Sequence, residues 1–181
     1  IYRQDGKIYV NGLVEPMDFN LIPFPYSVLD CEKDRVVYYE SSRGCPFRCS
    51  YCLSAADPSV RFLNMDRVKS ELGYFLYKKP PQVKLIDRTF NARPERAYEI
   101  FRYLIAGDNG VTNFHFEICA DLLDDRTLNL LAEARKGLFQ MEIGIQSTNP
   151  ATLAAVGRKD NVYPVLYNTE RLIKLGNIHV H

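Results

Sequence analysis

The sequence lacks several features that would assign it to common classes of protein. No apolar run approaches the roughly 18 residues of a membrane-spanning helix, so we expect no membrane partner. Charged residues are scattered through residues 1–20, which excludes a secretory signal there. Lys and Arg number 23 against 22 Asp and Glu, and this balance argues against the broad basic face of a general nucleic-acid binder. We find no clear nucleic-acid signal.

Motifs of several well-known enzyme classes are also missing. There is no phosphate loop of the Gly-x4-Gly-Lys type, no arguable Ser-His-Asp spacing, no internal repeat and no low-complexity tract. What is present is a chain of 181 residues, 46% hydrophobic and 25% charged. This composition is typical of one globular domain with a buried core.

The five cysteines are the most unusual part of the composition. Their number is odd, and three of them fall within eight residues, which does not fit a secreted disulfide framework. Clustered thiols in such a chain indicate metal chemistry in a reducing compartment, and we expect the cytoplasm. Cys31 and Cys119 lack ligand spacing, and Cys119 is predicted to be a small core residue.

Strand and helix patterns alternate through most of the chain. This order predicts right-handed βαβ units and a mostly parallel sheet, either an incomplete β/α barrel or an open doubly wound sheet. In both folds the active face lies at the carboxyl ends of the strands. Strands are expected over 36–39, 83–86, 114–119 and 141–145 and from 178 onward, and helices from 65 to the Pro80-Pro81 pair, from 94 to Gly107, from 124 or 125 to Gly137, from 149 to about 157, and from about 165 to Gly176.

The two parts of the chain differ in regularity. Residues 1–34 contain an Asp5-Gly6 turn and three prolines, which favour extended conformations over helix. We interpret them as a linker or arm from an upstream domain, and 35–181 as the core domain. Because the chain starts with Ile and stops within an apolar alternation, we expect a piece of a longer protein whose core is incomplete at the C-terminus.

Three of the cysteines form the motif C-x3-C-x2-C directly after the first expected strand. They are Cys45, Cys49 and Cys52. Structural zinc sites need four ligands, usually as two separated pairs, whereas three thiolates suit a 4Fe–4S cluster with one iron left open. Gly44 permits a tight turn off the strand, and Arg43 can offset the negative charge of a thiolate-bound cluster.

This motif, with the aromatic Tyr51 before its last cysteine, resembles the radical S-adenosylmethionine (radical SAM) superfamily. The span from about residue 36 onward is similar to that family's partial (β/α)6 barrel, truncated after about four βα units plus a fifth strand. The lead-in and the segments 86–91 and 142–147 are most similar to the branch with an upstream cobalamin-binding domain.

The resemblance implies roles for the residues of the cysteine motif. Cys45, Cys49 and Cys52 would bind three irons of a 4Fe–4S cluster, and the fourth iron would take the amino and carboxylate groups of SAM. The backbone near Tyr51 would help to hold the adenine. No residue of the chain is identified as catalytic.

The resemblance also implies SAM-binding positions at the ends of later strands. Where the family often has Gly-Gly-Glu after the second strand, this chain has Asp87, Arg88 and Thr89, a departure that puts the individual side chains in doubt. Glu117, late in the third strand, and Gln146, at the end of the fourth, would hydrogen-bond the SAM ribose and neighbouring groups. Glu117 alternatively points outward into a surface salt bridge.

The activity implied is reductive cleavage of SAM to a 5′-deoxyadenosyl radical that takes hydrogen from an unknown substrate. Its partners would be a one-electron reductant of the flavodoxin or ferredoxin type and, if the full-length protein carries the upstream domain, cobalamin. Two alternatives stay open: a non-catalytic iron–sulfur or zinc module, and a methylthiotransferase-like enzyme that modifies tRNA or protein.

Overall fold

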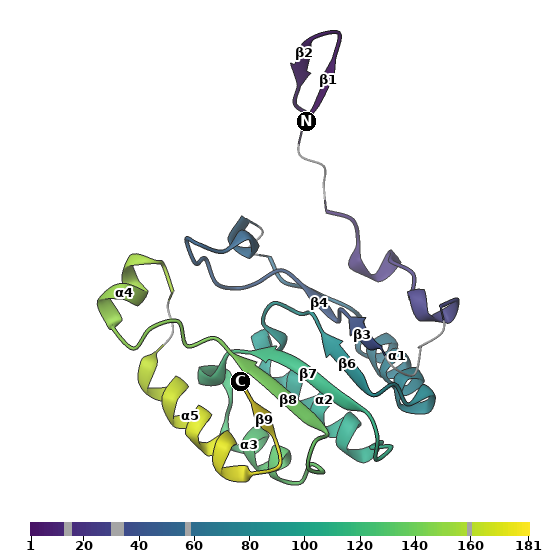
Figure 1. Cartoon of the computed structure of the whole chain (residues 1–181), viewed down its shortest axis with the longest axis vertical. Coiled ribbons are helices and arrows are strands. Elements are labelled where there is room, and N and C mark those ends of the chain that lie inside the picture. The colour runs from purple at the N-terminus through teal and green to yellow at the C-terminus, as the bar shows by residue number, and fades with distance from the viewer. Residues whose placement is uncertain (13–15, 30–34, 57–58, 159–160) are drawn as a thin grey trace.

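The computed structural model of the chain describes residues 1–12, 16–29, 35–56, 59–158 and 161–181, so Cys31 lies outside the described residues. A five-stranded parallel sheet forms its centre, with helices along one side (Figure 1). None of the helices in these ranges is long and apolar enough to cross a bilayer. The strands are β1 (Tyr2–Gln4), β2 (Lys7–Tyr9), β3 (Val36–Tyr39), β4 (Ser42–Arg43), β5 (Arg61–Phe62), β6 (Gln82–Leu85), β7 (Asn113–Ile118), β8 (Phe139–Ile143) and β9 (His179–Val180), and the helices are α1 (Met65–Lys78), α2 (Pro94–Ala106), α3 (Asp125–Ala132), α4 (Pro150–Ala155) and α5 (Val162–Leu175).

The order of strands in the main sheet decides between the two predicted architectures. The strands lie in chain order, β3-β6-β7-β8-β9, and every neighbouring pair is parallel. A doubly wound sheet reverses its strand order at a switch point, whereas a β/α barrel adds each strand beside the previous one. The arrangement is therefore that of a partial β/α barrel, and the predicted fold class is confirmed.

Alternation along the strands gives the sheet one apolar face. On this face Phe114 and Phe116 of β7 and Phe139 of β8 are fully buried under the helices. The ring centroids of Phe116 and Phe139 lie 5.7 Å apart, and the two ring planes make an angle of 71°. Phe101, which α2 contributes from the helix layer, packs its ring against both of them. Neighbouring helices in this layer contact one another in the order α1, α2, α3, α5. The core thus lies between the sheet and one helix layer.

The opposite face of the sheet is polar. In register across β6, β7 and β8 it carries Lys84 beside His115, and Glu117 beside Glu142. A lone two-layer protein would expose such a face to water, but in a β/α barrel it is the interior. A cavity of about 500 Å³ opens over it, lined by His115, Gln140, Glu142, Ile143, Gly144 and His181.

The expected elements all form, with boundaries shifted at three places, the simplest being α5, which begins at Val162 and not at about 165. The third helix ends at Ala132 instead of near Gly137. The side-chain amide of Asn177 donates to the carbonyls of Leu131 and Ala134, and so satisfies groups that a longer helix would have paired internally. The fourth strand spans Phe139–Ile143 and stops two residues earlier than predicted, because its partner β7 ends opposite Ile143.

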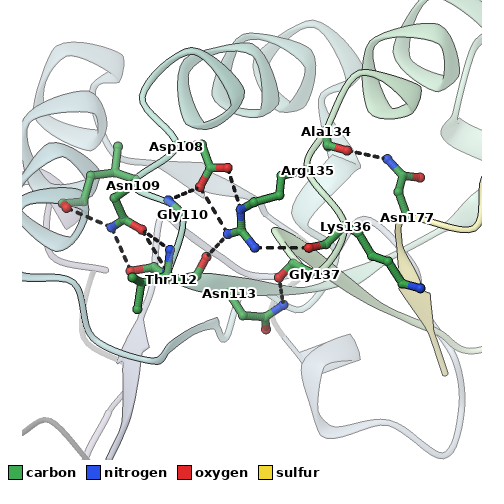
Figure 2. Close-up of polar contacts among 12 residues, drawn as sticks. Asp108, Asn109, Gly110, Thr112, Asn113, Ala134, Arg135, Lys136, Gly137 and Asn177 are labelled. Carbon is green, nitrogen blue, oxygen red and sulfur yellow. Dashed lines mark hydrogen bonds and ion pairs between the residues drawn. The ribbon is translucent and has the colours of Figure 1, made fainter.

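A hydrogen-bonded network fastens the loops at the amino ends of β7 and β8 (Figure 2). Arg135 donates to both carboxylate oxygens of Asp108, at 2.7 and 3.1 Å, and to the carbonyl of Thr112. Asn109 caps the turn by accepting from the backbone of Val111 and Thr112. In β/α barrels this edge serves stability, so we expect these residues to affect folding and not chemistry.

Residues before β3 form two separate pieces. A hairpin of β1 and β2 turns at Asp5 and Gly6, both with positive φ, as the Asp-Gly pair predicts. Further along, Phe19 is buried in the main core, and Phe24 packs its ring against Phe75 at 5.5 Å. The predicted linker or arm therefore contains a segment that belongs to the packed core.

Candidate iron–sulfur and S-adenosylmethionine site

The cysteine loop lies between two short paired strands beside the main sheet. β4 ends at Arg43 and pairs antiparallel with β5, so the cysteine loop, described over residues 44–56 and 59–60, is held together at its base. The thiols of Cys45 and Cys49 are buried and that of Cys52 is exposed, and none forms a disulfide. The loop follows β3 and therefore lies at the carboxyl edge of the sheet, where β/α proteins carry their sites.

Gly44 makes the base of this loop possible. Its φ is +102°, a conformation that L side chains rarely adopt. A Cβ at this position would lie 1.9 Å from the carbonyl oxygen of Ser59, on the returning arm of the loop. The glycine expected to allow a tight turn is thus required twice, for its dihedral angle and for the close approach of two backbones.

A second contact to the loop comes from the segment after α4, which sequence reasoning did not identify. The backbone N–H of Ser50 donates to the carbonyl of Val156 at 2.9 Å. Gly157 follows with φ +69°, and a Cβ there would lie 3.0 Å from the carbonyl oxygen of Arg48. The only sequence signal was the glycine that ends the expected helix, and this signal did not indicate what the glycine would contact.

The chemistry of the donor set fits an iron–sulfur cluster. Soft thiolates are the ligands such clusters take, and residues 44–60 contain no His and no further Cys to complete the usual four-ligand zinc site. Hydrogen bonds from Ser54 and the nearby charge of Arg88 lower the pKa of the Cys52 thiol, which favours the thiolate. Within the described ranges no three His, Cys, Asp or Glu side chains converge closely enough to hold a metal ion.

Residues 87–89, shortly after β6, differ in their exposure and contacts. Asp87 is fully buried, and its carboxylate accepts hydrogen bonds from Ser41 and Ser42, so the residue has no exposed surface for the contact with SAM that the resemblance implied. Arg88 is exposed at the open edge. Thr89 is buried, with its hydroxyl oxygen 3.4 Å from the sulfur of Cys45. The segment predicted to bind SAM therefore touches the cysteine loop directly.

Glu117 lies on the polar inner face and not on the outer surface. Its carboxylate is 3.8 Å from the Lys84 ammonium, which also lies 3.3 Å from Glu142. Burial raises the pKa of Glu117, and the neighbouring carboxylate of Glu142 raises it further. His115 has its Nε2 3.3 Å from Glu142. Two carboxylates therefore share one lysine beside a histidine, a combination that can bind and orient polar groups.

The two remaining predicted positions are exposed. Gln146 lies three residues beyond the end of β8, with φ +63°, so its predicted place at the strand end is wrong. Its side chain folds back over Gly144, where a Cβ would meet its amide nitrogen at 2.5 Å. Tyr51 is 55% exposed on the cysteine loop. Both side chains are exposed at this edge, and the Tyr51 hydroxyl interacts with Arg158 and Cys49.

Two further residues behave differently from the sequence expectations. Arg43 donates two hydrogen bonds to Glu40 and stacks over Phe19, so its charge is already compensated at the protein surface. Asn91 was not identified as important, yet it is buried and forms paired hydrogen bonds with the backbone of Cys119, at 2.7 and 2.9 Å. These bonds fix the end of β7. Cys119 itself is buried, as predicted.

The sequence of the chain is similar to that of a protein from an archaeon. The chain is 26% identical over 168 residues to an uncharacterized methyltransferase of Pyrococcus horikoshii, covering 87% of this chain and 36% of that protein. The chain thus spans about a third of the length of this curated relative.

Solved structures with a similar fold include two enzymes that use SAM. One is the radical SAM methyltransferase TsrM from Kitasatospora setae, with a TM-score of 0.64 and 20% identity over 82% of this chain and 30% of that chain. The other is the cobalamin-dependent SAM radical enzyme OxsB, with a TM-score of 0.62 and 18% identity over 80% of this chain and 23% of that chain. At these identities the likeness establishes the fold.

The family itself is established by sequence. The model of the radical SAM superfamily matches residues 39–181, which include the cysteine loop and every strand of the sheet after β3. Members of this superfamily are enzymes that use a 4Fe–4S cluster and SAM, as the resemblance of the cysteine motif predicted. The chain belongs to the radical SAM superfamily.

Proposed function

We propose that this chain is the core of an enzyme that binds a 4Fe–4S cluster and SAM at the carboxyl edge of its sheet and cleaves SAM reductively. The observation that supports this most directly is the position of three free thiols on one loop at that edge, in a chain of this family. When bound, the reduced cluster supplies one electron to the sulfonium of SAM, which releases methionine and a 5′-deoxyadenosyl radical.

The residues of the loop have separate tasks in this proposal. Cys45, Cys49 and Cys52 ligate the cluster through their thiolates. Two of these thiols are buried, which limits the access of water and oxygen to the ligands. Residues 44–60 contain no fourth Cys and no His, so one coordination position stays open for the small molecule.

The SAM molecule is held by groups that project from successive strand ends. Arg88 and Thr89 follow β6, where Thr89 touches the cysteine loop, and the charge of Arg88 acts on Glu117 of the neighbouring strand β7. Tyr51 and Gln146 are exposed at the same edge, and in this proposal they contact the adenine and the ribose.

The substrate lies over the polar inner face of the sheet. Here His115, Gln140, Glu142 and His181 present hydrogen-bonding groups to the cavity of about 500 Å³, and Lys84 lies 3.3 Å from Glu142 at its side. A polar or charged substrate suits this lining, because apolar molecules would leave these groups without partners.

The electron comes from a flavodoxin- or ferredoxin-type protein, and the enzyme works in the cytoplasm, where free thiols persist. Residues 1–34 are the connection to an upstream domain and 35–181 the radical SAM core. The packing of Phe19 and Phe24 on the core supports a fixed attachment of this connection.

The test is anaerobic reconstitution with iron and sulfide, followed by reduction with dithionite in the presence of SAM. We expect about four irons per chain and conversion of SAM to methionine and 5′-deoxyadenosine. Cys49→Ala abolishes both, whereas Cys119→Ala, a buried cysteine outside the loop, preserves both. Binding of one zinc without a chromophore, or iron loading without SAM cleavage, would overturn the proposal.

A second candidate within the same fold is cobalamin-dependent methyl transfer. It is favoured by the relative described as a methyltransferase and by the cobalamin bound in structures of OxsB and TsrM. It predicts that methyl groups leave SAM only when cobalamin is added, with S-adenosylhomocysteine as a product. A methylthiotransferase would instead release product without cobalamin.

A further inference from the structure

Asp87 carries a carboxylate buried at the point where the cysteine loop begins. Its side chain has no exposed surface. The carboxylate accepts three hydrogen bonds, from the Ser41 N–H at 3.0 Å, the Ser41 hydroxyl at 2.7 Å and the Ser42 hydroxyl at 2.5 Å. Ser42 belongs to β4, whereas Asp87 follows β6, so these bonds join two parts of the chain that are 45 residues apart.

The charge of this carboxylate is balanced nearby. Arg96, itself only 7% exposed, stacks over Phe62 at 5.3 Å and donates to the Ser41 carbonyl at 3.2 Å. Burial raises the pKa of Asp87, while the serine hydrogen bonds and the Arg96 charge oppose that shift. A buried carboxylate is costly unless hydrogen bonds and a nearby opposite charge compensate it, and here three hydrogen bonds and the Arg96 charge do so. The arrangement therefore holds Ser41 and Ser42 firmly.

The same segment makes a second contact with the cysteine loop. The Thr89 hydroxyl donates to the carbonyl of Arg88 at 2.8 Å and lies 3.4 Å from the sulfur of Cys45. Cys45 is three residues after Ser42. The first cysteine is thus fixed from both sides, through its own chain by Asp87 and through its sulfur by Thr89.

We propose that Asp87 is a positioning residue for the iron–sulfur cluster, which holds the Ser41-Ser42 segment so that Cys45 is fixed before the cluster binds. This inference rests on the proposed function and reassigns Asp87 from contact with SAM to support of a ligand. Groups that orient metal ligands contribute about 10- to 100-fold to metal affinity in known sites.

Asp108 offers a matched control at the opposite edge of the sheet (Figure 2). Its carboxylate also accepts three hydrogen bonds, two from Arg135 and one from the N–H of Gly110 at 3.0 Å. Asp87→Asn and Asp108→Asn each neutralise a carboxylate with three donors. Only Asp87→Asn alters hydrogen bonds to Ser41 and Ser42, the residues that lead into the cysteine loop.

The experiment loads the wild type and both variants with iron and sulfide anaerobically and follows iron release to an added chelator, together with the melting temperature. We expect Asp87→Asn to release iron about 10-fold faster than the wild type, and Asp108→Asn to release it at the wild-type rate although it melts lower. Ser42→Ala, which removes one of the three bonds, should fall between them and tests the inference if Asp87→Asn does not fold.

The outcomes separate this inference from the proposed function. Equal iron release from wild type, Asp87→Asn and Ser42→Ala would overturn the positioning role while leaving the cluster assignment in place. If the wild type takes up no iron, the proposed function fails first. Faster release in Asp108→Asn as well would mean that iron retention follows general stability, which also overturns the role.

Discussion

Replacing Gly44 by alanine should damage the cysteine loop far more than the same replacement at other glycines with positive φ. An added Cβ would meet the carbonyl oxygen of Ser59 at 1.9 Å, and because this atom belongs to the backbone, no change of rotamer relieves the contact. The two strands that flank the loop must then separate. Gly110 is the control, since its φ is +75° and a Cβ there meets nothing within 4 Å.

The expected magnitudes follow from these two environments. The left-handed conformation alone costs about 1–2 kcal/mol for a residue with a Cβ, which is the whole effect expected for Gly110→Ala. In Gly44→Ala the separation of β4 from β5 adds about 1 kcal/mol for each hydrogen bond lost, for a total of roughly 3 kcal/mol. Because β4 and β5 form a sheet of their own, this loss should remain local and leave the five-stranded sheet folded.

Thiol reactivity measures the local effect without any cofactor. In the cluster-free protein with Cys31 replaced by Ser, the exposed Cys52 should react quickly with a disulfide reagent, and the buried Cys45, Cys49 and Cys119 slowly. Gly44→Ala should bring Cys45 and Cys49 into the fast phase and leave Cys119 in the slow one, while circular dichroism shows an intact fold. If Gly44→Ala and Gly110→Ala react alike, the close approach of the two backbones is not what shapes the loop.

Three further predictions concern the body of the domain. Tyr39→Phe removes a buried 2.7 Å hydrogen bond to Glu71 and should lower the free energy of unfolding by about 1–2 kcal/mol in urea titrations; no loss would contradict that bond. Phe116→Ala opens a cavity in the aromatic core and should cost about 3–5 kcal/mol in the same assay, and a loss below 1 kcal/mol would mean that the core collapses around it. Burial and the Lys84 charge lower the pKa of His115 below its usual 6.5. The stability contributed by the neutral imidazole is therefore fully present above pH 6.5 and is lost as the pH falls towards the pKa of the folded state. An NMR titration of His115 should show the lowered pKa, and Lys84→Met should raise that pKa; an unchanged pKa in the variant would contradict the role of the Lys84 charge.

The order of elements could be predicted from the sequence because it depends on local patterns. Alternating apolar residues in β7 and helical spacing in α1 report burial along one element, and Asp5-Gly6 reports its own turn. The cysteine spacing, equally local, identified the chemistry of the site. Contacts between distant segments leave no such signal. Asp87 and Ser42 are separated by 45 residues, and nothing in the sequence around either residue indicates that their side chains are hydrogen-bonded.

Errors in the predicted site have the same origin. Gln146 was assigned to a strand end because residues 141–145 alternate, yet the length of β8 is set by where its neighbour β7 stops. Asn91 ends β7 by bonding to the backbone of Cys119, and this bond depends on the path of the chain after β6. A strand end is thus decided by two or three elements together, which single-segment patterns do not report.

The cysteine loop is anchored by protein contacts that need no metal. Asp87 fixes its entry through Ser41 and Ser42, Gly44 and Ser59 close its base, and the Ser50 N–H bonds to the carbonyl after α4. Because ordering a flexible loop costs roughly 1–2 kcal/mol per residue, these contacts remove much of the entropy that ligation would otherwise have to offset. Cys52 comes between the Ser50 and Ser59 anchors and is the exposed thiol of the three. Binding should therefore begin on the two buried sulfurs and end with the exposed one.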